Sequence, residues 1–311
     1  MKPASFPWKL LSVSLMGAGI GWVIYLLLST VDDFSRFVPD STGWLMVATF
    51  LVALSIGMMV IVFGLFLNSD ADRRYPPGLI ARLHVAGQLL RYLPGRLWGL
   101  AFQISASRET IPAIRLARAN LDFMVFAVIG SLSVGVGLLA YQGLWPWWTA
   151  TITMIGGVLI LCGLFLGGAS RILHQIGRFL PGRARRICEL LSMGQPSFLR
   201  LAAIMGVFMA SWATYLAGWS LLGLVFHCFA QVDFISLCAY YTLASGIGII
   251  SVLTPAGLGV REAAFVMLAT GSTDREAVAF FAVFGRVWLM IVEIILLVVI
   301  ALIFSRKKES S

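Results

Sequence analysis

Charged side chains are scarce in this chain of 311 residues, of which only 12% are Asp, Glu, Lys or Arg. Soluble globular domains carry about 25% charged residues. Apolar residues make up 59% of the chain, and apolar runs near the ~20 residues that cross a bilayer recur from end to end. This composition predicts an all-α polytopic integral membrane protein that forms a single transmembrane domain over residues 1–311.

Cysteine and histidine are also rare. The four cysteines have no C-x-x-C spacing, and Cys188 lies in a basic loop that we expect to face the reducing cytoplasm. The histidines, His84, His174 and His227, have no Cys or carboxylate at metal-ligand spacing. No Ser/His/Asp set, H-E-x-x-H or G-x-x-x-x-G-K motif is present. We therefore expect reduced thiols, no metal, no cofactor and no enzymatic activity.

The apolar runs predict about eight transmembrane helices. The first run exceeds the ~7–15 residues of a signal-peptide core and lacks an A-x-A-like cleavage site, so we expect a retained helix. The predicted spans lie near residues 8–29, 44–67, 121–141, 147–169, 201–226, 235–253, 257–271 and 277–304.

The net charge of +9 is distributed as a membrane topology requires. Loop 30–43 carries Asp32, Asp33 and Asp40 against one arginine, whereas most basic residues lie in 68–120, in 170–200 and near the two ends. The positive-inside rule and anionic lipid explain this distribution, which argues against nucleic-acid binding. It predicts an inner (cytoplasmic) membrane protein with both termini in the cytoplasm.

Two segments are too short to be assigned as simple spans. Residues 257–271 supply 15 positions, about 22 Å of helix against a core of ~30 Å, so a half-helix fits as well as a full crossing. Residues 77–103 contain two short apolar stretches around an interruption at 91–96. We favour a re-entrant hairpin there, and an amphipathic helix on the inner leaflet is the alternative.

The first interruption of an apolar helix lies at Thr254-Pro255. Proline disfavours helical geometry in the preceding residue and suits the first position of a new helix, with Thr254 as N-cap. Gly257 and Gly259 permit close approach of backbone or ligand. A helix starting at membrane depth exposes unpaired N–H groups and its positive dipole end, an arrangement that binds anions. Arg261 stands about one turn further on.

A similar interruption occurs in the first half, at Pro94-Gly95-Arg96, preceded by Arg91. Each break is followed by a polar linker and a long apolar helix. Paired interrupted segments in two halves of a chain indicate a transporter site. The pattern raises the hypothesis of an internal duplication, although the likeness is in pattern more than in residue identity.

Further charges occur in the last span. Arg286 and Glu293 are seven residues apart, on one helix face about 10 Å apart along the axis. An unpaired charge at the bilayer centre costs at least ~2.5–3.5 kcal/mol, so we expect partners on another helix, with Glu262 and Arg261 as the first candidates. Asp122, at the start of the third span, either completes this cluster or lies at the interface.

A purely structural interpretation remains open beside the functional one. Pro255 is then a packing kink, and Arg261 and Glu262 form a pair at the cytoplasmic interface. The functional interpretation takes Thr254, Pro255, Gly257, Gly259, Arg261, Glu262, Arg286 and Glu293 as a substrate-binding and translocation site, with a possible second motif at Arg91, Pro94, Gly95, Arg96, Trp98 and Asp122.

Two segments carry a family resemblance. Thr254-Pro-Ala-Gly-Leu-Gly-Val-Arg-Glu-Ala-Ala-Phe265, followed by Leu268-Ala-Thr-Gly271, resembles the most recognisable motif of the lysylphosphatidylglycerol synthase transmembrane region family, a bacterial membrane family. Arg91-Tyr-Leu-Pro-Gly-Arg-Leu-Trp98 resembles the family's earlier proline-glycine-tryptophan segment. The family's frequent Glu-Arg pair near the third span is not evident, since Asn120 and Asp122 occupy that region.

The resemblance implies a helical bundle with re-entrant elements and a lipid-translocating role in the cell envelope. In relatives, this module moves an aminoacylated phospholipid and is fused to a soluble aminoacyl-transferase domain, which this sequence does not show. We therefore expect a lipid flippase for a phosphate-bearing or glycosylated lipid, such as a phospholipid, a polyprenyl-phosphate lipid or a glycolipid. The alternatives are a non-transporting membrane partner of a cytoplasmic glycosyltransferase or envelope-assembly complex, and a lipid-modifying enzyme that uses Glu262 as general base.

Overall fold

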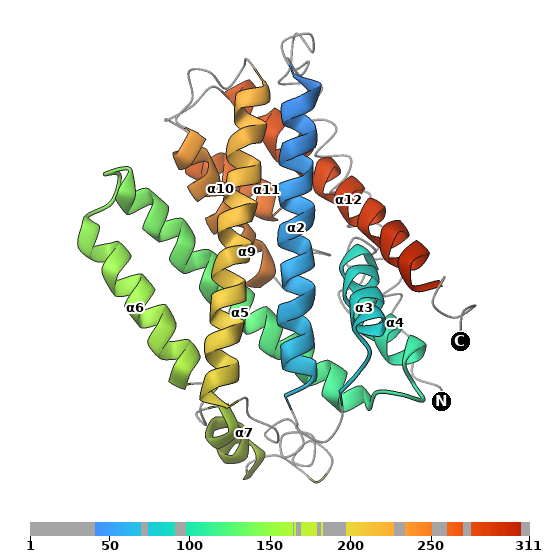
Figure 1. Ribbon diagram of the computed structural model, residues 1–311. Helices are drawn as coiled ribbons and strands as arrows, with labels where there is room; N and C mark the ends of the chain where they lie inside the picture. The colour runs from blue at the N-terminus through green and yellow to red at the C-terminus, as the bar shows by residue number, and fades with distance from the viewer. Residues whose placement is uncertain are drawn as a thin grey trace, which may run out of the picture.

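The computed structural model is helical throughout the part of the chain that it describes (Figure 1). Four of its helices are long and apolar enough to cross a membrane. This confirms the prediction of a helical membrane protein in its coarse form. The described residues are 41–69, 74–90, 98–163, 165, 169–178, 182, 197–226, 234–250, 260–269 and 275–305.

Four long helices form the frame of the bundle. The side chains of Ser41 and Ser197 accept hydrogen bonds from backbone N–H groups of the helices that follow them, as N-caps do. Pro112 stands immediately before the second long helix, where its missing N–H group costs nothing. The long helices are α2 (Thr42–Leu67), α5 (Ala113–Tyr141), α9 (Phe198–Val225) and α12 (Arg275–Ser305).

Six shorter helices complete the described fold. Two of them, α6 and α10, have 17 residues each, about 25 Å at 1.5 Å per residue. The others have 9 to 14 residues and are much shorter than the ~30 Å apolar core of a bilayer. The shorter helices are α3 (Pro77–Leu90), α4 (Trp98–Ala106), α6 (Trp147–Gly163), α7 (Ala169–Arg178), α10 (Phe234–Ile250) and α11 (Val260–Ala269).

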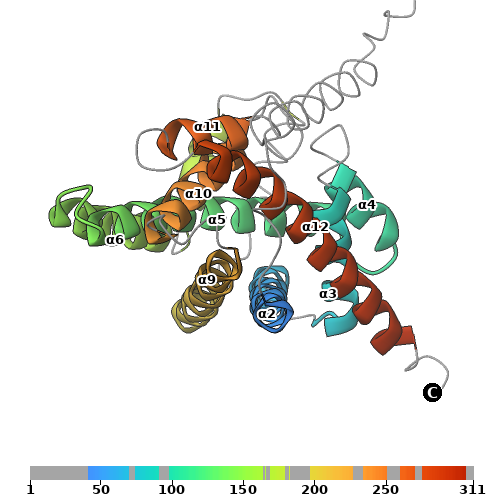
Figure 2. The same cartoon turned by 90° about the horizontal axis from the view of Figure 1, so that it is seen from above.

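Helices α2 and α9 lie side by side and run antiparallel (Figures 1 and 2). The hydroxyl of Ser55 donates to the carbonyl oxygen of Ser211 at 2.9 Å, and the hydroxyl of Ser211 donates to the carbonyl oxygen of Ser55 at 3.1 Å. Near one end, Gly218 lets α9 approach Ala48 and Val52 of α2. Small residues and interhelical hydrogen bonds are what hold membrane helices together, because lipid provides no hydrophobic drive between them.

Two buried hydrophobic clusters occupy the two halves of the bundle. The first is built mainly from α9, α10, α11 and α12 and is completed by Ala48 and Val52 of α2 and Val136 and Leu139 of α5. The second is built mainly from α2, α3 and α5 and is completed by residues of α9. Each cluster therefore takes side chains from both halves of the chain.

Several predicted boundaries differ from the observed ones. The predicted span at 121–141 begins earlier, at Ala113, because Leu116 and Ala119 are already buried against neighbouring helices. The predicted span at 147–169 ends sooner as an α-helix, at Gly163. The first predicted span, 8–29, lies outside the described residues.

The region 170–200 was expected to be a basic loop, and this was wrong for its first part. Helix α7 covers Ala169–Arg178 and places Arg171, His174, Gln175 and Arg178 on one face at intervals of three and four residues. This regular separation of polar from apolar positions stabilises a helix at an interface.

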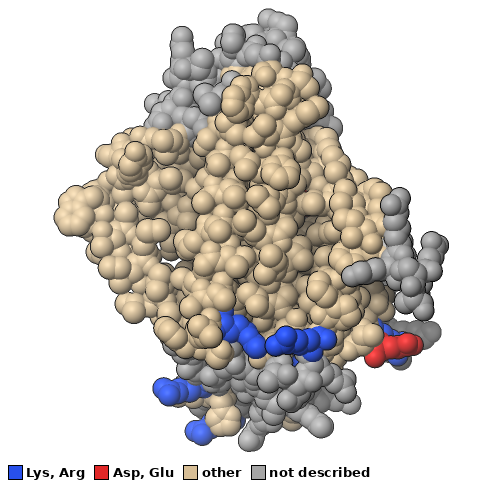
Figure 3. Space-filling model, viewed as in Figure 1, with Lys and Arg blue, Asp and Glu red and all other residues tan. Residues whose placement is uncertain are grey.

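Charged side chains on the face shown in Figure 3 gather toward one end of the bundle, and a wide surface without them lies above. That end holds the C-terminal end of α2 and the start of α9, because the Arg200 guanidinium donates to the carbonyl oxygen of Ser69. We call it the basic end. The exposed arginines Arg74, Arg82 and Arg108 belong to the segments around α3 and α4.

Candidate functional site

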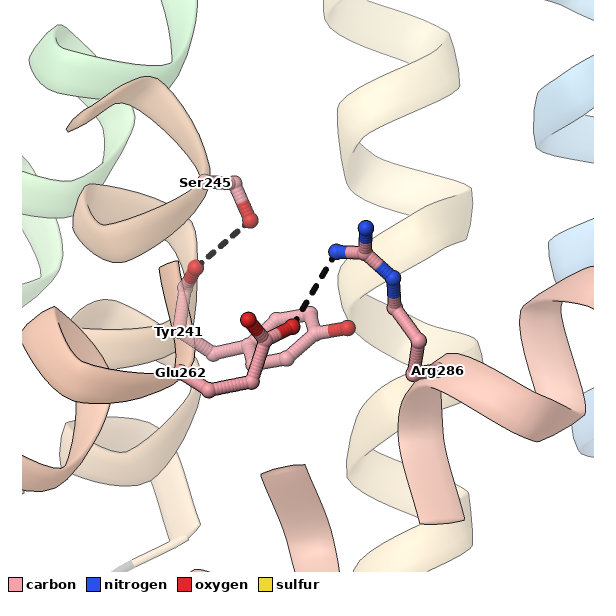
Figure 4. A network of polar contacts seen from close by, with 4 residues as sticks. All are labelled: Tyr241, Ser245, Glu262 and Arg286. Carbon is pink, nitrogen blue, oxygen red and sulfur yellow. Dashed lines mark hydrogen bonds and ion pairs between the residues drawn. The ribbon is translucent and has the colours of Figure 1, made fainter. Parts of the chain in front are cut away.

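A buried ion pair joins the last two helices. Nη1 of Arg286 on α12 donates to Oε1 of Glu262 on α11 at 3.1 Å, and the two side chains are only 12% and 9% exposed. Figure 4 shows them pointing toward one another across the gap between their helices. The sequence indicated that the charges of the last span require partners on another helix, and Glu262 was one of the two candidates.

Glu262 lies near the N-terminal end of a short helix. Helix α11 begins at Val260, and Glu262 lies in its first turn. The N-terminal end of a helix is the positive end of its dipole, where acidic side chains are favoured. Glu262 therefore lies between the start of α11 and the guanidinium of Arg286.

Arg261, the neighbour of Glu262, contacts a different group. Its Cζ atom lies 4.2 Å from the centroid of the Tyr241 ring on α10, a cation–π contact. Gly248 on α10 makes this approach possible, since a Cβ atom there would lie 3.0 Å from Cβ of Arg261. The adjacent residues Arg261 and Glu262 therefore connect α11 to α10 and to α12 respectively.

An aromatic cluster lies beneath the charged groups. The Tyr241 ring is 4.5 Å from Trp219 and 5.6 Å from Phe265, between ring centroids, and Phe281 packs against all three. The hydroxyl of Ser245 donates to the carbonyl oxygen of Tyr241, one turn back on α10 (Figure 4). These bulky rings exclude water from one side of the site, which strengthens the electrostatic interactions within it.

Glu293 is the second buried carboxylate on α12. It is 4% exposed and lies between Val292 and the exposed Ile294, two turns beyond Arg286. Its distance from Arg286 along the axis is about 10 Å. Helix α12 therefore carries two buried ionisable side chains, Arg286 and Glu293, at different heights.

Asp122 lies apart from this cluster. Its Oδ2 atom accepts a hydrogen bond from Nε of Arg118, one turn back on α5, at 3.4 Å. The side chains of Arg118 and Asp122 are 15% and 19% exposed, and they pair within α5. Membership of the Glu262 cluster and a place at the membrane interface both stay predictions for Asp122.

The first-half motif is described only in part. Trp98, at the start of α4, is 47% exposed. The remaining predicted site residues, Thr254, Pro255, Gly257, Gly259, Arg91, Pro94, Gly95 and Arg96, lie outside the described residues.

A network of uncharged polar groups near α4 was not anticipated from the sequence. Nδ2 of Asn120 on α5 donates to Oε1 of Gln103 on α4 at 2.6 Å, and Nε2 of Gln103 donates to the carbonyl oxygen of Leu83 on α3 at 3.1 Å. Gln103 is only 2% exposed. A glutamine in a nine-residue apolar helix was the available signal, because a buried amide requires partners.

Tyr241 and Trp219 were also missed. The sequence places them in apolar spans, where aromatic residues are common. Only the packing of α10 on α11 brings Tyr241 to Arg261, and only the packing of α9 on α10 brings Trp219 to Tyr241. Comparison with family models, with curated proteins and with solved structures finds no match to this chain.

Proposed function

We propose that this protein is a lipid flippase or transporter that moves a phosphate-bearing or glycosylated lipid between the leaflets of a bacterial inner membrane. The ion pair of Arg286 and Glu262, buried among apolar helices, is the observation that supports this proposal most. Ionisable residues inside a membrane bundle are costly to insert and typically mark substrate or ion pathways.

The ion pair gives the site two states with balanced charge. Without substrate, Glu262 neutralises Arg286. When a lipid phosphate enters, its oxygen atoms replace the carboxylate as acceptors for the planar guanidinium, which suits bidentate binding of phosphate. Arg261 lies next to Glu262 and supplies a second cation for the same anion.

The displaced carboxylate allows the site to return to its substrate-free state. Once the phosphate occupies the guanidinium, the carboxylate of Glu262 no longer pairs with Arg286. Departure of the lipid restores the ion pair. Glu293, also buried on α12, provides a second carboxylate on the same path.

The resemblance of residues 254–271 to the lysylphosphatidylglycerol synthase transmembrane region family supports the same class of substrate. The basic end of the bundle supports the orientation. By the positive-inside rule it faces the cytoplasm, together with both termini. Anionic headgroups of the inner leaflet are attracted to such a surface.

Leaflet exchange in proteoliposomes tests the proposal. Purified protein is reconstituted with headgroup-labelled phospholipid, polyprenyl-phosphate lipid or glycolipid, and the labelled lipid reaching the other leaflet is quantified. We expect exchange of one lipid class by the unaltered protein and its loss in Glu262→Ala and Arg286→Ala.

The matched control is Glu109→Gln, which removes an exposed carboxylate between α4 and α5 and should leave exchange unchanged. Folding of every variant is checked by size-exclusion chromatography and circular dichroism. A folded unaltered protein that moves no lipid in the panel would refute transport of these lipid classes.

A second candidate function is a membrane partner of a cytoplasmic glycosyltransferase or envelope-assembly complex. The exposed arginines of α7, Arg171 and Arg178, support it, because a charged helix face at the basic end suits a protein partner. Under this function, Arg171→Glu with Arg178→Glu abolishes the partner's activity in cells, whereas Glu262→Ala has little effect.

A further inference from the structure

We infer that residues 42–141 and 198–305 are two inverted copies of one unit, and that the helical hairpin of each copy gates one face of the lipid path against the last helix of the other copy. This inference rests on the proposed transport function for the path, and on the internal symmetry of the fold for the gates.

The two copies have the same order of elements. A long helix, two shorter helices and a second long helix appear as α2, α3, α4 and α5, and again as α9, α10, α11 and α12. The lengths also agree: 26, 14, 9 and 29 residues in the first copy, against 28, 17, 10 and 31 in the second. Helices α6 and α7 lie between the copies.

The reciprocal bonds between Ser55 and Ser211 locate the symmetry axis. These serines are 156 positions apart, and each donates to the carbonyl oxygen of the other. Met58 and Thr214, which also contact one another, have the same separation. In a two-fold arrangement a residue meets its own counterpart only at the axis. The axis therefore passes between α2 and α9 at these residues.

Burial along α2 and α9 repeats with the same separation. Of the eight buried residues of α2, all except Gly64 have a buried residue 156 positions later on α9. In this correspondence Ala48 matches Ile204, Val52 matches Phe208, and Phe63 matches Trp219. Ala48 and Val52 complete the second-half cluster, and Ile204 and Phe208 complete the first-half cluster, as two-fold symmetry requires.

The contacts of the hairpins repeat as well. Phe63 packs on His84 of α3 with ring centroids 4.8 Å apart, and its counterpart Trp219 packs on Tyr241 of α10 at 4.5 Å. Within the hairpins, two glycines approach closely in the first copy, since a Cβ atom on Gly99 would lie 2.5 Å from the carbonyl oxygen of Gly87. In the second copy, Gly248 approaches Arg261.

The copies have opposite directions in the membrane. Helix α2 ends at the basic end, where α9 begins, so the two run antiparallel. Helix α3 starts at the basic end beside Phe304, near the C-terminal end of α12. Helix α10 follows the far end of α9 and runs antiparallel to α5, since Leu243 contacts Gly135 and Gly246 contacts Ser131. The two hairpins therefore enter from opposite faces.

Each hairpin packs on the last helix of the other copy, and these two seams are the gates. At the basic end, the ideal Cβ position of Gly78 on α3 is 2.4 Å from the Phe304 ring of α12. On the other face, the corresponding position of Gly135 on α5 is 2.5 Å from Leu243 of α10. A headgroup from the inner leaflet enters between α3 and α12, reaches Arg286 and leaves between α10 and α5.

In each copy a polar side-chain contact joins the third helix to the fourth, but one contact is between charged groups and the other is between neutral groups. Glu262 and Arg286 join α11 to α12 by an ion pair, whereas Gln103 and Asn120 join α4 to α5 by a neutral bond. The charged pair holds an anionic headgroup, and the neutral pair keeps its own hairpin closed without competing for the anion. Opening one gate while the other closes follows the rocking of inverted repeats in transporters.

Disulfide locks test the two gates. In a background without native cysteines, Gly78→Cys with Phe304→Cys closes the seam at the basic end, and Gly135→Cys with Leu243→Cys closes the other. At each seam, side-chain atoms of the partner residue lie within 3 Å of the ideal Cβ position of the glycine, so the two helices are in close contact where the cysteines are placed. A disulfide spans about 3.5–4.5 Å between its Cβ atoms. The matched control is Ser55→Cys with Ser211→Cys, which links the helices at the axis, where the halves do not separate.

The readout is independent of any lipid substrate. Spin labels measure the distance across one seam in nanodiscs of phosphatidylethanolamine and phosphatidylglycerol while the other seam is locked. We expect each lock to shift the opposite seam to longer distances, the control to shift neither, and dithiothreitol to reverse the shift. Seams that stay closed under both locks, or that open together, would overturn the inference.

Exchange measurements on the same proteins separate this inference from the proposed function. If each seam opens when the other is locked but the unaltered protein moves no lipid, the gates stand and the lipid function fails. If the protein moves lipid and neither lock stops it, the gates are wrong and transport stands. We expect loss of exchange in both locked proteins and its retention in the axis control.

Discussion

Glu262 and Arg286 are 24 residues apart in the chain, yet Nη1 of Arg286 lies 3.1 Å from Oε1 of Glu262. They come from different helices and lie on the buried side of both, next to an aromatic cluster on α9 and α10. The pair links the short helix α11, too short to cross the membrane alone, to the longest helix of the described chain. Loss of this ion pair should therefore affect both the stability of the protein and the proposed lipid site.

Removing one partner of this pair should destabilise the protein more than removing both. We expect Glu262→Gln or Arg286→Gln to lower the free energy of unfolding by about 3–5 kcal/mol, because each leaves a buried charge without its counter-ion. The double variant should lose less than either single variant, and therefore less than their sum. Unfolding in mixed micelles, analysed as a double-mutant cycle, measures the coupling. Additive losses would show that the two groups do not interact.

The aromatic ring of Tyr241 should matter more than its hydroxyl for holding Arg261. Tyr241→Phe retains the ring face under the guanidinium, whereas Tyr241→Leu removes it together with a cation–π contact of about 0.5–2 kcal/mol. We expect Tyr241→Leu to be clearly less stable than Tyr241→Phe in the same unfolding measurement. The difference should shrink in an Arg261→Gln background. An unchanged difference would exclude the contact as its cause.

The hairpin of α3 and α4 should depend on Gly99. A methyl group there would lie 2.5 Å from the carbonyl oxygen of Gly87, so Gly99→Ala must separate the helices, and overpacking typically costs about 1–3 kcal/mol. The matched control is Gly137→Ala on α5, where a Cβ atom meets nothing within 4 Å. Thermal unfolding should show a lower Tm for Gly99→Ala only. Equal effects of the two substitutions would contradict close packing of the hairpin.

The bond from Nε1 of Trp288 to the hydroxyl of Thr49, 3.1 Å long, fastens α12 to α2. Thr49→Val keeps the shape of the side chain and removes the acceptor. We expect a loss of about 0.5–1.5 kcal/mol, the usual net contribution of a hydrogen bond. A shift in the wavelength of the tryptophan emission maximum should accompany the loss. Thr149→Val, an exposed threonine bonded to Pro146 on its own turn, is the control and should leave the spectrum unchanged.

The long helices could be predicted from the sequence because each carries its own signal. Apolar runs of 26 to 31 residues satisfy their backbone polar groups internally, so hydrophobicity and length suffice to find α2, α9 and α12. Short helices were less predictable, and α7 was missed within a basic segment, where its amphipathic spacing was the available signal. Their stability depends on neighbours that the local sequence does not specify.

The sequence by itself determined that this is a helical membrane protein and that Arg261, Glu262, Arg286 and Glu293 require an explanation, since composition and the cost of buried charge are local properties. Only the tertiary structure decided that Arg286 pairs with Glu262, that Arg261 lies on Tyr241, and that Ser55 meets Ser211. These choices depend on which helix faces meet and at what height. The packing of small residues between distant segments determines which faces meet and at what height. The sequence of one apolar helix does not specify which other helix packs against it.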